Sequence, residues 1–451
     1  METSELIKKI EQSGHRKIKY AISDIDGILR AKVVHLDKFM AAVKEGMGFC
    51  DVIFGWDAND SCYDNTVFTG WHTGYPDRKA SIDLDTFRTI PWENGMPYFL
   101  ADFSSEASGT VPCPRSLLKK VSAQCDDFGF KAVFSHEFEW FNFVGTPNQH
   151  AASDYRELTP LSPGMFGYSQ LRPALYQSYY HELFDFLEQF QVPLESFHTE
   201  TGPGVYEASI AYDEILAAAD KAILFKSAVK EIAYRHGVIA SFMAKWNENL
   251  PGSGGHIHQS LQGNEGGKNL FWPDDPQKPM TALLENYLAG QLKCLPDILP
   301  MYAPTINSYK RLRLGAWAPS TVTWGKDNRT AAIRLISSDK RSARLEMRVP
   351  GADCNPYLAM AAALASGLYG IRNNLTLTIP ESCGNAYEDT RAVRLPASLA
   401  EATQAMRKSA IARELFGDSF VEHFVSTREW ECREFERTVT EWEVKRYLEI
   451  I

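Results

Sequence analysis

The sequence predicts an α/β or α+β protein with a small N-terminal domain and a large C-terminal domain. Segments with the alternation of β-strands recur along the chain, and segments with helical spacing lie between them. A polar stretch, Ser104–Pro114, interrupts both patterns, so we assign residues 1–107 and 108–451 to the two domains. A chain of 451 residues is long enough to form domains with sizeable cores.

The N-terminal domain is expected to begin with a helix and to continue as strands joined by turns. Residues 5–12 have the spacing of a short amphipathic helix, and Lys17–Ser23 alternates like a strand. A turn leads to a second strand near Ile28–Leu36, and helical spacing returns over Lys38–Glu45. Strand and turn patterns then continue from Thr66 to Phe103.

The C-terminal domain is expected to alternate between helices and strands. A helix from Arg115 to about Phe128 precedes a strand, Lys131–Phe138, whereas Val144–Ser162 has few apolar residues and is interpreted as a surface loop. The alanine-rich stretch Tyr357–Ile371 is too short to span a membrane and predicts a buried helix. Further helical patterns occupy Ser169–Gln191, Asp213–His236, Thr281–Leu295 and the charged residues from Leu395 onward.

The composition narrows the class of protein. A formal net charge of −10 with a pI near 5.6 argues against nucleic acid as the main partner. The eight cysteines are scattered without a Cys-x-x-Cys pair, which favours reduced thiols in a cytoplasmic protein over disulfides or a zinc site. The N-terminal residues lack the apolar core of a signal peptide, so we expect no membrane attachment.

Arginines gather around a short alternating segment near residue 346. On a strand, Arg344, Glu346 and Arg348 share one face, because successive side chains point to opposite faces. Guanidinium groups bind carboxylate and phosphate oxygens through paired hydrogen bonds. With Lys310-Arg311, Arg329 and Arg334 just upstream, the segment predicts a site for an anionic substrate.

Carboxylates and histidines form three further motifs. Glu137 and Glu139 would share a strand face, where like charges repel unless a cation such as Mg²⁺ or Mn²⁺ joins them. The alternative is an exposed acidic strand. Glu200 and Glu207 flank a tight turn, and they could be metal ligands or only two acids beside a turn. His256 and His258 alternate behind a glycine-rich loop. Carboxylates, histidines and arginines together are what the joining of ATP to a carboxylate requires.

In this order, the motifs resemble glutamine synthetase, specifically the bacterial type I branch and its γ-glutamyl-amine ligase relatives. The resemblance runs through nearly the whole chain. It rests on Glu137-x-Glu139, Glu200…Gly202-Pro-Gly204…Glu207, Gly252-Ser-Gly…His256-x-His258-x-Ser260, Asn307-Ser-Tyr-Lys-Arg311, Ala318-Pro319, Asn328-Arg329…Arg334, Arg344-x-Glu346-x-Arg348 and Asn355-Pro-Tyr-Leu358.

The resemblance implies an α+β fold with an N-terminal β-grasp domain and a catalytic domain built on a curved antiparallel sheet. It also implies active sites between subunits of two stacked hexameric rings, forming a dodecamer, with two to three Mg²⁺ or Mn²⁺ ions in each site. By resemblance, one metal would be held by Glu139, Glu200 and Glu207 and a second by Glu137, His256 and Glu346. The substrates would contact Arg311, Arg348 and Gly252 (glutamate), Arg329 and Arg334 (the transferred phosphoryl group), and His258, Ser260 and Arg344 (ATP).

Three departures from the family pattern bear on the substrate. Trp317 occupies the place of the flap glutamate that helps deprotonate ammonium, and an indole can instead pack on an alkyl or aryl group or merely buttress the flap. Asp57 falls where the family aspartate binds ammonium across the subunit interface, with Asp60 as a rival. Pro251 and Val205 replace a loop asparagine and a common glutamine, which could alter the grip on the acid substrate.

The expected function is therefore an ATP-dependent ligase that joins L-glutamate to an organic amine, with Trp317 and Asp57 at the amine. The alternatives are a glutamine synthetase that uses ammonium and, below it, a catalytically silent structural member of the superfamily. Tyr387 lies near the family's adenylylated tyrosine, but its neighbours do not match that site, and we expect no such regulation.

Overall fold

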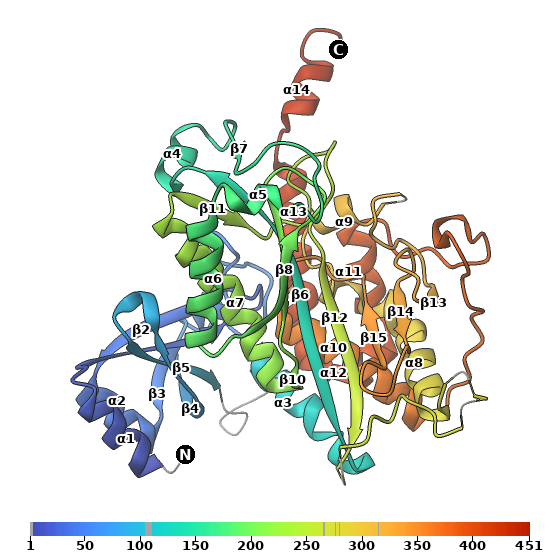
Figure 1. Ribbon diagram of the computed structural model, residues 1–451. Helices are drawn as coiled ribbons and strands as arrows, with labels where there is room; N and C mark the ends of the chain where they lie inside the picture. The colour runs from blue at the N-terminus through green and yellow to red at the C-terminus, as the bar shows by residue number, and fades with distance from the viewer. Residues whose placement is uncertain (1–2, 104–110, 265–266, 276, 279, 314) are drawn as a thin grey trace.

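The computed structural model describes residues 3–103, 111–264, 267–275, 277–278, 280–313 and 315–451. Two sheets organise them, one of five strands near the N-terminus and one of ten strands in the rest of the chain (Figure 1). The assigned boundary between residues 107 and 108 lies outside the described residues. Two separate clusters of buried apolar side chains accompany the two sheets. The predicted α+β fold with an antiparallel catalytic sheet is confirmed.

The small sheet has the strand order β2-β1-β5-β4-β3, and helices α1 and α2 pack against it (Figure 1). Strand β1 is antiparallel to β2 and parallel to β5, the central strand. The expected N-terminal helices and strands are all present. Their bounds are α1 Thr3–Gln12, β1 Lys17–Ser23, β2 Leu29–His35, α2 Leu36–Glu45, β3 Met47–Cys50, β4 Asp77–Ile90 and β5 Met96–Phe103.

The large sheet carries the candidate site. Its main path runs in the order β13-β14-β15-β12-β6-β9-β8, and every neighbouring pair except β13 with β14 is antiparallel. Strands β7, β10 and β11 also pair with the long β6. The bounds are β6 Phe130–Val144, β7 Thr159–Pro160, β8 Leu194–Thr199, β9 Val205–Ile210, β10 Asp213–Glu214, β11 Val238–Ser241, β12 Gly255–Gly263, β13 Trp324–Lys326, β14 Ile333–Ile336 and β15 Arg344–Met347.

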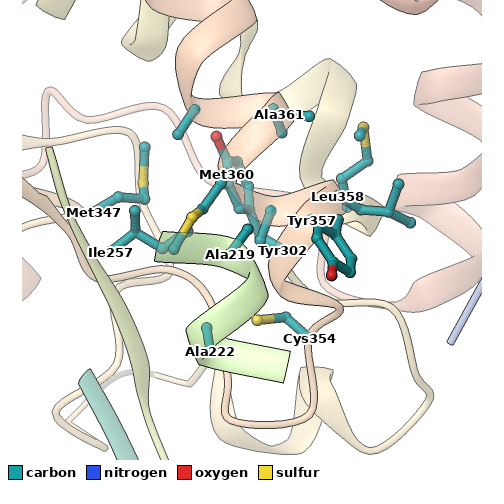
Figure 2. Close-up of a cluster of buried hydrophobic side chains, with 14 of the residues drawn as sticks. Ala219, Ala222, Ile257, Tyr302, Met347, Cys354, Tyr357, Leu358, Met360 and Ala361 are labelled. Carbon is teal, nitrogen blue, oxygen red and sulfur yellow. The ribbon is translucent and has the colours of Figure 1, made fainter. Parts of the chain in front are cut away.

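A layer of helices covers the back of this sheet. Alternation turns Ile257 of β12 and Met347 of β15 toward this layer, where Figure 2 shows them beside Ala219 and Ala222 of α7 and Met360 of α10. Burial of these apolar side chains stabilises the sheet by roughly 25 cal/mol per Å² of area removed from water. The bounds of the helices between residues 114 and 372, inside and outside this layer, are α3 Pro114–Ala123, α5 Leu171–Ala174, α6 Gln177–Gln189, α7 Ile215–Arg235, α8 Ala282–Ile298, α9 Ser308–Arg311 and α10 Pro356–Arg372.

Close contact between α8 and α10 explains the small residues of α10. A Cβ on Gly290 of α8 would lie 2.3 Å from the carbonyl oxygen of Ser366, and one on Gly370 would lie 2.0 Å from that of Asn286. Only glycine lets the two backbones approach this closely. The expected buried helix at Tyr357–Ile371 is thus confirmed.

The segment 144–162, expected as a surface loop, is partly regular. It contains α4, Pro147–Ala152, and the two residues of β7. A proline at the helix start and reciprocal hydrogen bonds between Thr146 and Gln149 stabilise this short helix. The low content of apolar residues gave no sign of this helix, because capping hydrogen bonds stabilise it and burial of an apolar face does not.

The C-terminal residues are helical as expected, in α11 Leu399–Lys408, α12 Ala410–Phe416, α13 Asp418–Arg437 and α14 Glu441–Tyr447. The last of these projects away from the body of the molecule (Figure 1). Within the described residues, no helix is long and apolar enough to cross a membrane.

Candidate active site

A row of charged side chains crosses the large sheet from β14 to β8. Neighbouring strands place its members opposite one another, and alternation turns them all to the face away from the helices. The row steps two residues along β12, from His258 to His256, and two residues along β6, from Glu137 to Glu139. The facing pairs are Arg334–Glu346, Glu346–His258, His256–Glu137, Glu139–Glu207 and Glu207–His198.

The first group able to hold a metal ion consists of Glu137, His256 and Glu346. Nδ1 of His256 lies 3.0 Å from Oε1 of Glu137 and 3.6 Å from Oε1 of Glu346. Ser209 donates a hydrogen bond of 2.9 Å to the other oxygen of Glu137. The structure thus brings together the three residues that the resemblance assigns to one metal.

The second group consists of His198, Glu200 and Glu207. Nε2 of His198 lies 3.4 Å from Oε2 of Glu207 and 3.6 Å from Oε1 of Glu200. We did not predict His198. The sequence carried a signal, because His198 and Glu200 are spaced by two residues like Glu137 and Glu139, on a segment with strand alternation.

Glu139, expected with Glu200 and Glu207, lies between the two groups. It faces Glu207 in the sheet and accepts a hydrogen bond of 2.7 Å from the backbone amide of Gly254. A Cβ at Gly254 would lie 2.6 Å from Nε2 of His256 and 3.1 Å from Oε1 of Glu139. Glycine at this position therefore leaves room for both ligands.

Both groups fit a hard divalent cation. Carboxylate oxygens with imidazole nitrogens suit Mg²⁺ or Mn²⁺, and the described residues place no cysteine among them. Burial, with Glu137 and Glu139 nearby, raises the pKa of Glu207 to about 9. Burial lowers the pKa of His198, but the nearby carboxylates of Glu200 and Glu207 outweigh it and raise that pKa to about 10. A cation at this position would relieve the repulsion among the carboxylates.

The arginines surround the buried carboxylate of Glu346. Arg334 donates to Oε2 of Glu346 at 3.0 Å, and Arg348 donates to Oε1. Burial raises the pKa of Glu346, but the charge of Arg348 and the nearby histidines outweigh it and lower that pKa to about 2. The Nε atoms of Arg334 and Arg348 are buried and without a partner among the described residues, so they remain available to an anionic ligand.

Arg311 lies against the glycine loop that precedes β12. Its guanidinium donates to the carbonyl oxygens of Val349 and Arg348 at 2.9 and 3.3 Å. A Cβ at Gly252 would lie 2.9 Å from Cγ of Arg311 and 2.5 Å from the carbonyl oxygen of Ala244. Gly252 is therefore a position of close backbone approach, as expected for a ligand-binding loop.

Two cavities flank the row. One of about 850 Å³ contains the three residues expected at ATP, with Glu137 at its wall, and Arg344 donates to His258 there at 3.0 Å. The other, of about 820 Å³, contains Trp317 and Pro251 and reaches Thr201, the neighbour of Glu200. The expected nucleotide residues and the expected amine residue thus lie in different cavities. The nucleotide-side residues are His258, Ser260 and Arg344.

Asp57 and Asp60 lie on the N-terminal domain. Asp57 accepts backbone hydrogen bonds from Asn59 and Ser61 at 2.8 and 3.0 Å, and Nε1 of Trp430 donates to its other oxygen at 3.0 Å. Asp60 instead forms an ion pair of 2.7 Å with Arg30. Within the described residues of one chain, neither carboxylate hydrogen-bonds to a residue of the charged row.

Arg329 is exposed in a turn before β14. Its charge acts on Tyr168, whose pKa is raised by burial and by Glu200 and lowered by Arg329. Tyr168 stacks on His198 with ring centroids 4.4 Å apart. The charge of Arg329 therefore reaches Tyr168 beside the second metal group, and its role at the phosphoryl group stays a prediction.

The chain matches the family model described as the glutamine synthetase catalytic domain over residues 111–447. It is 50% identical to type-1 glutamine synthetase 2 of Dictyostelium discoideum, over 99% of this chain and 86% of that protein. It is also 37% identical to glutamate–isopropylamine ligase of a Pseudomonas species, over 98% of this chain and 97% of that protein. A solved structure of a GmaS/ADP complex covers 98% of this chain and 99% of its own, with a TM-score of 0.84 and 26% identity.

The chain therefore belongs to the glutamine synthetase family. As a member it is an ATP-dependent carbon–nitrogen ligase, and its relatives include glutamate–amine ligases as well as glutamine synthetases.

Proposed function

We propose that this ligase joins L-glutamate to an organic amine to form a γ-glutamylamide. The observation that carries the proposal is that Trp317 lines the cavity beside the second metal group. By resemblance, this residue takes the place of the flap glutamate of glutamine synthetases. An indole cannot accept the proton of ammonium, but it can pack on the apolar part of an amine. Other apolar side chains line the same cavity: Met165, Met243, Trp246 and Leu250.

Two relatives support an organic amine. Besides the isopropylamine ligase, a protein named γ-glutamylethanolamide synthetase from Streptomyces coelicolor is 35% identical over 95% of this chain and 92% of its own length. Both printed names specify amines larger than ammonium. We extend that substrate class to this chain.

In the first proposed step, an oxygen of the γ-carboxylate attacks the γ-phosphorus of ATP, giving γ-glutamyl phosphate and ADP. Arg311 and Arg348 would hold the glutamate, and the unpartnered Nε of Arg334, with Arg329, would stabilise the charge on the transferred phosphoryl oxygens. Mg²⁺ or Mn²⁺, held by the two carboxylate–histidine groups, would neutralise phosphate charge.

In the second step, the amine nitrogen attacks the activated carbonyl carbon, the carbon–nitrogen bond forms and phosphate leaves. The nitrogen must lose a proton, and we propose that Asp57 of a neighbouring subunit accepts it. General-base help of this kind contributes about 10²–10⁴-fold to the rate. The resemblance adds stacked hexameric rings to the proposal. Among the described residues, Asp57 forms no hydrogen bond to the charged row of its own chain, so the base would come from a neighbouring subunit. The eight free cysteines suit a reducing cytoplasm.

The second candidate is a glutamine synthetase that uses ammonium, which the Dictyostelium relative's name favours. A catalytically silent structural protein is the weakest candidate, because both metal-binding groups and the arginines around Glu346 are assembled. Selection for shape alone would not require this set.

The test measures phosphate release from ATP by the purified protein with Mg²⁺ and L-glutamate, using ammonium, methylamine, ethanolamine, isopropylamine and aniline in turn, with product mass checked in each case. We expect an organic amine to exceed ammonium at least tenfold in kcat/KM, about 1.4 kcal/mol. Trp317→Glu should then reduce the organic-amine activity and increase use of ammonium, whereas Trp71→Glu, an exposed tryptophan on the N-terminal domain, should change neither. A preference for ammonium in the wild type would reject the proposal in favour of a glutamine synthetase.

A further inference from the structure

The cavity beside Trp317 carries an excess of positive charge. Lys245, Lys310 and Arg313 line it, and Glu248 is the only acidic side chain among its lining residues. Across the described part of the chain, none of the three cations forms an ion pair with a carboxylate. The charge is therefore available to whatever enters the cavity.

The three cations are held in different ways. Lys245 donates from Nζ to the carbonyl oxygen of Leu250, which fixes its side chain in the wall. The ammonium of Lys310 lies 5.8 Å from the centre of the Phe435 ring, and Arg313 is exposed at the cavity. Burial and then the charge of Arg313 lower the pKa of Lys245. The charge of Arg313 therefore reaches the part of the cavity that Lys245 lines. No carboxylate of the described residues forms an ion pair with either side chain.

We propose that Lys245, Lys310 and Arg313 select acceptor amines that carry no second positive charge, so that the enzyme takes uncharged alkyl or hydroxyalkyl monoamines and rejects diamines. This proposal rests on the proposed function and specifies its substrate class. The assignment concerns the far end of the amine, beyond the nitrogen that reacts.

The expected selection arises from the second positive charge of a diamine and not from repulsion of amines in general. Every primary alkylamine arrives as an ammonium ion near neutral pH, so the first charge is common to all of them. A diamine adds a second ammonium, which must enter a cavity that already contains unpaired cations. Like charges in a partly enclosed space interact more strongly than in bulk water, and salt weakens the interaction.

The test compares pentylamine, 4-aminobutan-1-ol and putrescine, which have the same number of non-hydrogen atoms and differ only at the far end. We expect the kcat/KM of putrescine to be at least tenfold below those of the other two, about 1.4 kcal/mol. The gap should narrow as ionic strength rises from about 0.01 to 0.5 M. Putrescine equal to or better than pentylamine would overturn the proposal. A 4-aminobutan-1-ol rate as low as that of putrescine would also overturn it, because polarity and not charge would then be rejected.

A second experiment reverses the charge of cavity residues by substitution. Arg313→Glu and Lys310→Glu should raise the putrescine-to-pentylamine ratio at least tenfold, and Arg313→Gln should have a smaller effect in the same direction. The matched control is Arg372→Glu, since Arg372 is exposed at the end of α10 and bonded to Gln124. An unchanged ratio in the reversed variants would reject the role of these cations. If ammonium is the only acceptor used, the proposed function fails, which is a different result from amine use without charge selection.

Discussion

His198 on β8 faces Glu207 on β9, and its Nε2 atom lies 3.4 Å from Oε2 of that carboxylate. Glu200 approaches the same imidazole nitrogen at 3.6 Å. The pair completes a group that could hold a metal ion at the edge of the charged row. It also adds a histidine that the motif pattern did not identify, and its contribution can be measured.

The first prediction concerns this histidine. His198→Ala should weaken Mn²⁺ binding at least tenfold, in the range typical for loss of a ligand or its hydrogen-bonding partner. Calorimetric titration of the ATP-free protein with Mn²⁺ would show it as the loss or weakening of one class of sites. His181→Ala, an exposed histidine on α6, serves as the control. Unaltered binding in His198→Ala would mean that the imidazole only stacks on Tyr168.

The second prediction concerns metal removal. Burial, with the charges of Glu137 and Glu139 nearby, raises the pKa of Glu207 to about 9, so a bound cation should stabilise the fold. Chelation with EDTA should lower the Tm of the wild type. Glu207→Gln should retain the Tm of the metal-free wild type and lose most of the response to EDTA. Glu188→Gln, an exposed acid at the end of α6, should respond like the wild type. An equal EDTA effect in Glu207→Gln would show that Glu207 does not hold the ion.

The third prediction separates Asp57 from Asp60. If Asp57 receives the amine proton, Asp57→Asn should lower kcat by about 10²–10⁴-fold with little change in the KM for ATP. Asp60→Asn should lose only the ion pair with Arg30, a partly exposed contact of about 0–1 kcal/mol. Steady-state kinetics with the best amine would decide. A large loss of kcat in Asp60→Asn, together with a small loss in Asp57→Asn, would assign the role of proton acceptor to Asp60 instead.

The fourth prediction concerns acid stability. His423 on α13 is fully buried, its ring nitrogens have no hydrogen-bond partner among the described residues, and burial followed by the charge of Arg428 lowers its pKa from 6.5 to about 3. Because the folded pKa lies below the unfolded one, its contribution to stability is complete above about pH 6.5 and is lost as the pH falls toward 3, at most about 1.4 kcal/mol per pH unit.

His423→Leu should therefore lose less of its Tm between pH 7 and pH 5 than the wild type does. The comparison uses calorimetry in matched buffers, with the exposed His72→Leu as the control. If His423→Leu shows the same fall in Tm as the wild type and the control, ionisation of His423 does not cause the loss of stability between pH 7 and pH 5.

Much of the fold followed from periodicity. The strand alternation at residues 131–138 corresponds to β6, because burial of one strand face leaves a period of two residues. The alanine-rich apolar run at residues 357–371 corresponds to α10, because burial of a whole helix leaves a continuous apolar stretch. The helix α4 was missed, since it depends on a capping box around Thr146 and not on an apolar stripe. Capping involves single polar residues and leaves no period.

The sequence by itself determined the chemistry of the site, because strand alternation places Glu137 with Glu139, and Arg344 with Glu346, on shared faces whatever the remaining fold. Only the tertiary structure decided which strands are neighbours. Register between β8 and β9 brings His198 to Glu207, and register between β14 and β15 brings Arg334 to Glu346. The tertiary structure also places Lys245 and Arg313 around the cavity that Trp317 lines. Lys245 and Arg313 lie far apart along the chain, so no local pattern brings them together. The strand partners are closer in sequence, but their register depends on which strand faces the core buries.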